Sequence, residues 1–363
     1  MSNSYAAAGV DVEAGERAVA LMKASVLAAT RPEVVGDFGG FAGLFDASVL
    51  KNFRRPLLAT GTDGVGTKVV VAQQMGIHHT IGIDLVAMIA DDIVVCGAEP
   101  LFLTDYIATG KVQPEVVADI VRGVADGCTQ AGMALIGGET AEHPGVMQPG
   151  EYDLAGAGTG VVEADEVLGA DRVAAGDVVI SLAASGLHSN GFSLARHVLL
   201  GELGHKAGLS LTSHVDEFGR TLGEELLEPT RIYVRDCLAL KQQLGTGLHA
   251  LSHITGGGIA ANIARVLPTQ LAADIERNTW RIHPVFGVIA NLGNVTESEM
   301  EKTFNMGLGM VAIVAPSHAA AAIALLQARG IECAQIGVVR TRADGEVGDA
   351  VAKGGKGGAV SLR

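Results

Sequence analysis

A glycine-rich loop, Gly61–Lys68 (GTDGVGTK), places a carboxylate and a lysine between an apolar run and a stretch compatible with a helix. Glycines let backbone N–H groups approach an anion closely, and an aspartate can hold a divalent cation that the anion shares. Asp63 and Lys68 therefore fit a metal-chelated polyphosphate. An ordinary turn in which Asp63 caps the following helix explains the same residues, and this segment alone leaves both interpretations open.

The loop differs from a Walker A motif in the position of its lysine. That motif needs a lysine directly after its last glycine and then a serine or threonine, with the backbone wrapped around the phosphates. Here Thr67 stands before Lys68, and Asp63 inside the loop would repel phosphate unless a cation lay between them. We therefore reject a P-loop nucleotide hydrolase and keep a metal-mediated nucleotide site.

Acidic residues recur where apolar strands end or helices begin. Besides Asp63 they are Asp84, Asp91, Asp92 and Glu139. Two helical turns separate Asp84 from Asp91 and Asp92, so we expect these carboxylates on one helix face. Mg²⁺ prefers a few carboxylates together with phosphate oxygens, and the set as a whole favours a magnesium site. Taken singly, Asp84 could cap a helix and Asp91 could be solvated.

Two further glycine-rich segments lie in this half of the chain. Gly137 and Gly138 follow an apolar strand and precede Glu139, where they permit another close backbone approach. The segment Gly36–Phe41 (GDFGGF) mixes aromatic residues with glycines, which is typical of a mobile lid and also of an ordered surface turn.

In the second half, two loops each lie between a predicted strand and a predicted helix. They are Ser185–Gly191 (SGLHSNG) and His253–Gly258 (HITGGG). Ser189 or Asn190 could cap the first helix, and we expect His188 to be exposed. Free N–H groups at a helix start suit a monophosphate or an oxyanion. An ordinary hydrogen-bonding role for His188 and His253 within their loops is supported about as well as anion binding.

The sequence Gly256–Ala261 (GGGIAA) also fits a loose dinucleotide-binding fingerprint, with Asp274 as the acid that would follow it. Pro268 interrupts the intervening segment and no clean second strand precedes the acid. A nicotinamide site is therefore disfavoured.

Composition excludes several classes of protein. The net charge of −14 argues against nucleic acid as a partner, because phosphate backbones demand basic patches. Four scattered cysteines (Cys96, Cys128, Cys237 and Cys333) indicate reduced thiols and a cytoplasmic location. No signal peptide is expected at the N-terminus. Pro316 divides the longest apolar stretch, Met306–Ala328, into a strand and a helix, so no membrane association is expected.

A length of 363 residues predicts two domains. Strands and helices alternate in both halves, including a strand predicted at His79–Asp84 and a helix at Leu85–Cys96. We place an N-terminal domain at 1–168 and a C-terminal domain at 169–345. The tail 346–363 has no apolar periodicity and is predicted to be disordered.

Nine motifs stand in an order that resembles the phosphoribosylformylglycinamidine cyclo-ligase (aminoimidazole ribonucleotide synthetase) family. They are GTDGVGTK, TIGIDLVAM, GAEPLF, DYIATGK, GGETAEHPG, ASGLHSNG, PTRIY, HITGGG and TFNMGLGM. The resemblance runs from Ser4 to about Val339. It implies an α+β chain of two α/β-type domains, each a mixed sheet packed with helices, whose N-terminal domains pair in a homodimer, with an active-site cleft between the domains.

The resemblance also implies a reaction. ATP would phosphorylate the formyl amide oxygen of formylglycinamidine ribonucleotide, and a nitrogen on the amidine side would then attack that carbon. Loss of phosphate leaves aminoimidazole ribonucleotide and ADP, a step of de novo purine biosynthesis. Phosphorylation turns a poor leaving group into a good one, so positioning and charge neutralisation would carry the rate.

The same resemblance assigns site residues by position. The carboxylates for Mg²⁺ are Asp63, Asp84, Asp92 and Glu139. The residues assigned to contact ATP are these four together with Gly64, Gly66, Thr67, Lys68, Asp105, Gly137 and Gly138. The substrate falls to His188, Ser189, Asn190, Gly191, Thr255, Gly256, Gly257 and Gly258. His253 is the candidate for polarisation or proton transfer, and Lys68 is the second catalytic candidate.

The chain departs from the family pattern at four positions. Ala6 and Ala7 stand where lysine and aspartate are usual, Asp91 replaces an asparagine and Leu187 a proline. Two alternatives to this family's activity stay open. One is another ATP-using enzyme of the same superfamily, such as a thiamine-phosphate kinase or a selenophosphate synthetase. The other is a non-catalytic nucleotide-binding subunit.

Overall fold

The chain divides into two units, which a computed structural model describes for residues 11–36, 39–352 and 354–363. The first unit comprises the chain up to Ile93 together with Glu99–Glu163, and the second comprises Val94–Ala98 and Ala164–Arg363. The predicted division after residue 168 falls shortly beyond this change of unit. Ala6, Ala7 and two residues of the glycine-rich segment, Asp37 and Phe38, lie outside the described residues.

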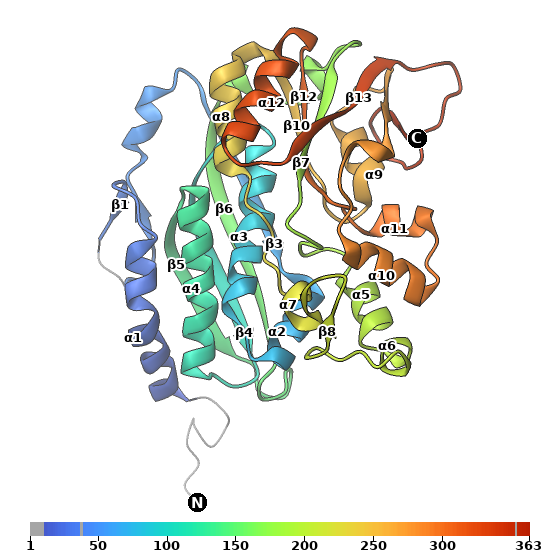
Figure 1. The fold of residues 1–363 in the computed structure, drawn as a ribbon. Coiled ribbons are helices and arrows are strands. Elements are labelled where there is room, and N and C mark those ends of the chain that lie inside the picture. The colour runs from blue at the N-terminus through green and yellow to red at the C-terminus, as the bar shows by residue number, and fades with distance from the viewer. Residues whose placement is uncertain (1–10, 37–38, 353) are drawn as a thin grey trace, which may run out of the picture. The chain divides into compact units, whose positions relative to one another are not determined.

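The first unit is built on a four-stranded mixed sheet (Figure 1). Its strands, in spatial order, are β3 (Pro56–Gly64), β6 (Tyr152–Glu163), β4 (Glu99–Thr109) and β5 (Ala134–Glu142). Strands β4 and β5 are parallel, and the other neighbours are antiparallel. Its helices are α1 (Val12–Ala28), α2 (Val69–Met75), α3 (His79–Val94) and α4 (Pro114–Ala131). A small pair, β1 (Val34–Val35) and β2 (Leu44–Phe45), lies beside them.

Helix α3 lies close against β6 because that strand carries glycine at three alternate positions, 156, 158 and 160. A Cβ added at Gly156 or Gly158 would come within 2.9 or 2.7 Å of Ile89, and one at Gly160 within 2.6 Å of Ile93. Alternate residues of a strand face the same side of the sheet. This row of glycines therefore forms the surface on which α3 rests and fixes the height of the acidic residues that α3 carries.

The strand predicted at His79–Asp84 is wrong, because these residues form the first turns of α3. Gly82 suggests a break in a helix, but here it allows a close crossing with α4. A Cβ at Gly82 would come within 2.4 Å of the Ile120 carbonyl oxygen, and one at Gly123 within 1.7 Å of the His79 carbonyl oxygen. Tertiary packing thus overrides the local helix propensity of glycine.

The second unit is built on a six-stranded mixed sheet. Its strands, in spatial order, are β10 (Leu248–His253), β12 (Leu308–Val314), β7 (Val178–Ala183), β13 (Cys333–Thr341), β11 (Leu271–Ile275) and β14 (Ala359–Leu362). Its main helices are α5 (Phe192–Leu199), α8 (Val234–Leu244), α9 (Gly258–Arg265), α10 (Pro284–Gly293), α11 (Glu297–Thr303) and α12 (Ala319–Ala328). Shorter elements are α6 (Glu202–Lys206), β8 (His214–Val215), β9 (Arg220–Thr221) and α7 (Leu222–Leu226). The predicted α+β architecture is confirmed.

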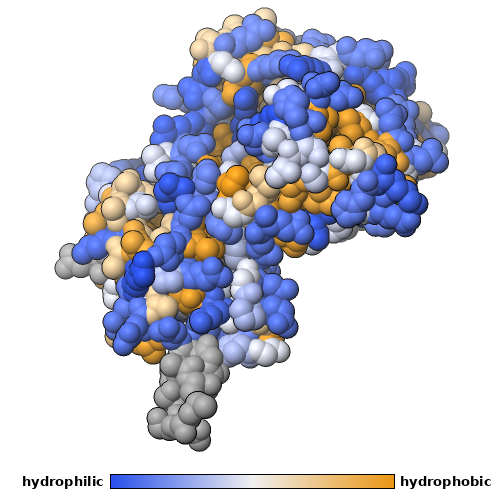
Figure 2. Space-filling view, turned by 60° about the horizontal axis from the view of Figure 1, so that its bottom comes forward, coloured by the Kyte–Doolittle hydropathy of each residue, from blue (hydrophilic) through white to orange (hydrophobic). Residues whose placement is uncertain are grey.

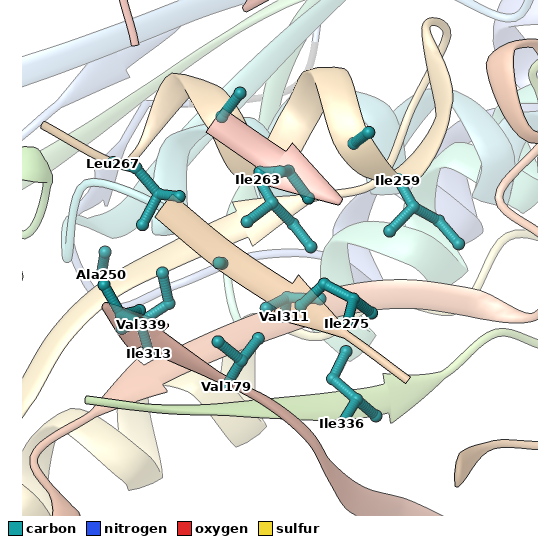
Figure 3. Close-up of a cluster of buried hydrophobic side chains, with 14 of the residues drawn as sticks. Val179, Ala250, Ile259, Ile263, Leu267, Ile275, Val311, Ile313, Ile336 and Val339 are labelled. Atoms are coloured by element: carbon teal, nitrogen blue, oxygen red, sulfur yellow. The ribbon is translucent and has the colours of Figure 1, made fainter. Parts of the chain in front are cut away.

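A hydrophobic core holds α9 against this sheet (Figure 3). Ile259 and Ile263 of α9, together with Leu267, pack on strand residues that include Val311 and Val339. The start of α9, which carries the predicted substrate glycines, is thereby fixed by apolar burial.

The predicted disorder of the tail 346–363 is wrong for residues 359–362. Strand β14 pairs in parallel with β11, and Val360 is fully buried. Gly357 and Gly358 before it serve close approach, because a Cβ at Gly357 would lie 2.1 Å from the Ala264 carbonyl oxygen and one at Gly358 2.5 Å from that of Leu271. The four-residue strand is too short to show a period in the sequence.

The apolar stretch Met306–Ala328 contains β12 and α12, as predicted. Among the helices that the described residues form, none has the length and hydropathy needed to cross a membrane.

Candidate functional site

The loop Gly61–Lys68 begins inside β3 and leads into α2. Asp63 is the penultimate residue of β3, and its Oδ1 accepts a hydrogen bond of 2.7 Å from the Gly64 N–H. Gly66 has a φ of 72°, in the left-handed region that favours glycine. The N-cap position of α2 is Lys68, so Asp63 is not the residue that caps this helix.

Lys68 and Asp84 form a fully buried ion pair. The Lys68 Nζ lies 2.9 Å from Asp84 Oδ1 and 2.8 Å from Oδ2, and neither side chain is accessible to solvent. The pair joins the start of α2 to the first half of α3. Lys68 was predicted to contact ATP, yet in the structure its ammonium contacts this carboxylate. Asp84 lies within α3 and is not a helix cap.

The acidic residues of α3 do not share one face. Asp91 is buried like Asp84, whereas Asp92 is exposed. Eight residues turn an α-helix about 80° past its starting direction, while seven return it close to that direction. The prediction of a common face is therefore wrong for Asp92, and the alternative of a solvated Asp91 is also wrong.

Asp63 and Asp105 lie in one row across the sheet. In the strand register, Asp63 of β3 is opposite Gly156 of β6, Gly156 is opposite Asp105 of β4, and Asp105 is opposite Gly138 of β5. Two strand spacings separate the two aspartates, about 10 Å. Residues opposite each other point to the same side of a sheet, and Ile89 of α3 packs over Gly156, which lies between the two aspartates.

Asp105 is a buried carboxylate at the base of a pocket. Burial raises the pKa of Asp105 to about 7. Within residues 11–36, 39–352 and 354–363, its Oδ2 has no hydrogen-bond partner. A Cβ at Gly138 would lie 1.9 Å from Asp105 Oδ1, so only glycine fits beside this carboxylate.

This pocket of about 380 Å³ brings several predicted residues together. Asp105, Gly137, Gly138 and Glu139 line one wall, and Ala18, Val19 and Met22 of α1 line another. Gly36, Gly39 and Gly40 of the predicted lid also line it.

The four predicted metal ligands are not gathered into a complete centre. Among the residues that the structure describes, no group of three or more histidine, cysteine, aspartate or glutamate side chains is close enough to hold a metal ion. Asp84 is bound to Lys68, while Asp92 and Glu139 are exposed.

In the second unit, both predicted substrate loops lead from a strand into a helix. Gly191 is the N-cap of α5 with a φ of 78°, and Gly257 is the N-cap of α9 with a φ of 100°. Neither Ser189 nor Asn190 is the capping residue. The Ser189 hydroxyl instead lies 3.1 Å from that of Thr230.

The two loops contact each other. A Cβ added at Gly256 would lie 3.2 Å from Asn190 Oδ1. The structure therefore brings Ser185–Gly191 and His253–Gly258 to one place, as the prediction of a shared substrate site requires.

The segment Glu301–Gly307 supports both loops. The Asn305 Nδ2 donates to the carbonyl oxygens of Gly186 and Leu187 at 3.0 and 3.3 Å. Phe304 leaves no room for a Cβ at Gly191, and the Glu301 carbonyl leaves none at Gly258. The sequence marked this segment only as part of a motif, and no residue pattern there indicated that Asn305 fixes the first loop.

Both candidate histidines are buried, and the expectation of an exposed His188 is wrong. His188 is 2% exposed and has a φ of 61°. Its Nε2 accepts a hydrogen bond of 3.2 Å from the Ser185 N–H, so this nitrogen is unprotonated. His253, the last residue of β10, is 5% exposed.

The topology of this unit excludes the dinucleotide-binding interpretation. That fold requires parallel strands around a crossover helix. The strands before and after α9, β10 and β11, are not neighbours in the sheet. Asp274 is bound to Arg340, with 2.7 Å between its Oδ2 and the arginine Nε.

Comparison with known proteins agrees with this architecture. Residues 45–162 match the model of the AIR synthase related protein N-terminal domain, and residues 174–350 match that of the C-terminal domain. The chain has the fold of a thiamine-monophosphate kinase from Stenotrophomonas maltophilia, with a TM-score of 0.65 at 17% identity over 95% of both chains. At this identity the likeness concerns the fold alone.

Two similar proteins are named phosphoribosylformylglycinamidine cyclo-ligase. The protein from Anaeromyxobacter dehalogenans is 52% identical over 349 residues, which cover 95% of this chain and 98% of that protein. The protein from Brevibacillus brevis is 50% identical over 94% of this chain and 96% of its own length. The chain therefore belongs to the phosphoribosylformylglycinamidine cyclo-ligase family.

Proposed function

We propose that the chain catalyses the ATP-dependent cyclisation of formylglycinamidine ribonucleotide to aminoimidazole ribonucleotide, with release of ADP and phosphate, in de novo purine biosynthesis. The observation that carries this proposal is the identity of about half of the residues to cyclo-ligases over nearly the whole chain. The two substrate loops that meet in the second unit support it.

The reaction proceeds in two transfers. The formyl oxygen attacks the γ-phosphorus of ATP, the bond to the β-phosphate oxygen breaks, and ADP leaves. A nitrogen of the amidine side then attacks the formyl carbon, and the C–O bond breaks to release phosphate. The protein supplies orientation and charge neutralisation. His253, beside the substrate loops, is the group to which we assign proton transfer during ring closure.

We assign ATP to the first unit. The glycines at 64, 66, 137 and 138 permit close approach of backbone N–H groups to phosphate, and Thr67 adds a hydroxyl. The pocket at Asp105 gives the nucleotide a partly apolar wall from α1. Lys68 would have one of two roles. It would either hold the Asp84 carboxylate in place through their ion pair, or leave Asp84 and bind a phosphate of ATP instead.

Magnesium is the metal that the donor set fits. Mg²⁺ is commonly held by one or two carboxylates plus phosphate oxygens and water, so a complete protein cage is not required. Since no three of these carboxylates lie together among the described residues, Asp63, Asp92 or Glu139 would each supply a single carboxylate, and Asp84 would do so if it separated from Lys68. When bound, the ion neutralises charge on the transferred phosphoryl group.

We also propose a homodimer formed through the first units. Strand β3 is an edge strand of its sheet, and an edge presents backbone groups that another strand or chain can cover. Leu57 and Leu58 on this strand are 39% and 61% exposed, and Figure 2 shows apolar patches reaching the molecular surface. Exposed apolar patches of this kind mark interaction sites.

The cytoplasm is the compartment we propose, and small molecules rather than nucleic acid are the partners. All four cysteines are free, which suits a reducing environment. The net charge of −14 opposes association with nucleic acid.

The experiment is a reconstituted assay with the purified chain, ATP, MgCl₂ and formylglycinamidine ribonucleotide. We expect one ADP for each aminoimidazole ribonucleotide formed and no ADP release when the ribonucleotide is omitted. Consumption of ATP on thiamine phosphate or selenide without ring closure would refute the proposal. ATP binding without turnover would identify the chain as a non-catalytic subunit.

A further inference from the structure

A second large pocket lies wholly in the second unit. It has a volume of about 570 Å³. One side is formed by Ala183, Ala184 and Ser185 at the end of β7, where the first substrate loop begins. Its charged or ionisable residues are Glu217, Arg220, Glu225, Glu228, Arg231, Arg281, His283 and Glu332.

The three arginines of the pocket differ in the ion pairs and hydrogen bonds that their side chains form within the protein. Arg220 is bound on two sides, by Glu225 at 2.6 Å and by Glu228. Arg231 and Arg281 have no hydrogen bond or ion pair from their side chains within the part of the chain that the structure describes. A guanidinium is a rigid fork of donors that matches two oxygens of a phosphate. These two residues therefore provide donor capacity that the protein itself leaves unused.

Residues close in sequence to Arg231 and Arg281 form hydrogen bonds with the first substrate loop or with Ala184, the residue directly before it. The Ser185 hydroxyl donates to the Pro229 carbonyl at 2.6 Å, and Ser189 contacts Thr230, the residue directly before Arg231. On the other side, the His283 Nε2 lies 3.0 Å from the Ala184 carbonyl oxygen.

The backbone at Arg281 packs closely against Gly307. Gly307 has a φ of 95°, and a Cβ there would lie 2.5 Å from the Arg281 carbonyl oxygen. Arg231 and Arg281 thus lie on two segments that both pack on the loop assigned to the substrate.

We propose that Arg231 and Arg281 bind the 5′-phosphate of the ribonucleotide substrate in this pocket, whose lining includes Ser185 of the first loop but none of the residues assigned to the substrate from the family resemblance. The proposal rests on the function proposed above, because the substrate named there is a phosphate monoester.

The carboxylates of the pocket further restrict the chemical class of ligand that it can bind. Glu225 and Glu228 are engaged by Arg220, whereas Glu217 and Glu332 are exposed. Such a mixture suits a ligand that carries both an anion and a cation better than a simple anion. An amidine is a strong base and is protonated near neutral pH, so the substrate carries a positive group in addition to its phosphate.

The test compares the full-length variants Arg231→Gln and Arg281→Gln with the wild type. A charged hydrogen-bonded pair contributes about 1.5–3 kcal/mol, so each variant should raise KM for formylglycinamidine ribonucleotide by roughly tenfold to hundredfold. The KM for ATP should stay within about twofold. The lysine variants at the same positions should recover part of the loss because they keep the charge but not the fork.

A ligand control separates phosphate recognition from general damage. Calorimetry with ribose 5-phosphate and with ribose measures what the phosphate group adds, and the glutamine variants should lose that difference. Arg122→Gln, an exposed arginine of the first unit, removes the same charge and should change neither KM nor binding. An equal loss for the phosphorylated and unphosphorylated ligands, or a KM within twofold of wild type, would overturn the proposal.

The two proposals can fail separately. If ring closure is absent but ribose 5-phosphate binding still depends on both arginines, the function is wrong and the phosphate site stands. If ring closure proceeds with an unchanged KM in both variants, the phosphate site is wrong and the function stands.

Discussion

At the scale of single residues, the buried contact between Lys68 and Asp84 determines how the first unit can treat phosphate. Two charges without solvent access stabilise each other only while both are present, because each alone would be an uncompensated buried ion. The sequence indicates both residues as functional, but it cannot show that they contact each other across 16 positions, since that contact depends on how α3 packs.

We predict that Asp84→Asn lowers the free energy of unfolding by about 3–5 kcal/mol, because Lys68 would keep a buried charge without its partner. Urea denaturation of the variant and the wild type measures this. Glu202→Gln removes the partner of the exposed Lys206 and should cost less than about 1 kcal/mol. A similar small cost for both substitutions would contradict a structural role for the buried pair.

Asp105 gives a second prediction at this scale, concerning pH. Its pKa in the folded state, about 7, lies above the value of about 3.9 in an unfolded chain, because burial disfavours the charged form. The folded state therefore holds this proton more tightly than the unfolded state, and the wild type loses stability as pH rises from about 4 through about 7.

The variant Asp105→Asn removes this titration. Its stability relative to the wild type should rise over the same pH interval, by on the order of 4 kcal/mol, and level off above it. Urea denaturation across pH gives the difference curve. A flat curve for Asp105→Asn would show that the carboxyl does not titrate with a raised pKa.

At the scale of elements, glycines determine how closely the helices approach the sheet of the first unit. Gly156, Gly158 and Gly160 lie under α3, and Gly82 lies where α3 crosses α4. At each of these glycines, any side chain would force α3 away from the sheet or away from α4. The height of α3 above the sheet in turn sets where Asp84 and Asp91 lie relative to Asp63.

We predict that Gly158→Ala destabilises the protein by about 1–3 kcal/mol, because its Cβ would lie 2.7 Å from Ile89. Gly15→Ala in α1 provides the matched control, since a Cβ there meets nothing within 4 Å. That control should be more stable than the wild type by roughly 0.5–1 kcal/mol, from helix propensity. Thermal denaturation distinguishes the two, and equal effects would refute the close packing of α3.

The elements that the sequence predicted well are those that local patterns determine. Pro316 separates β12 from α12, and both loops with glycine at a helix start were placed correctly. The errors arose where long-range packing decides. The strand predicted at His79–Asp84 is instead helix, where Gly82 allows the close crossing with α4, and the tail has no apolar periodicity although β14 pairs with β11.

The candidate site followed the same division. Residue types and motif order indicated Asp63, Asp105, Glu139 and both loops of the second unit. Burial of His188 and the exposure of Asp92 depend on three-dimensional packing, so no local pattern reported them.

At the scale of the whole molecule, the edge strand β3 predicts an association of two chains. The variant Leu58→Glu should convert a dimer to monomers, because a carboxylate would replace an apolar group in the interface. Sedimentation equilibrium at micromolar concentration measures this. Val347→Glu, at a 78% exposed position of the second unit, should leave the dimer intact. A monomeric wild type, or the same mass for both variants, would contradict the proposal.

The central claim is that phosphorylation of the formyl oxygen drives ring closure. The most direct measurement uses formylglycinamidine ribonucleotide with a heavy oxygen isotope at the formyl position, incubated with the purified chain, ATP and MgCl₂. Mass spectrometry of the products should find the label in the released phosphate, one labelled phosphate for each aminoimidazole ribonucleotide. Unlabelled phosphate, or ATP hydrolysis without the imidazole product, would contradict the account.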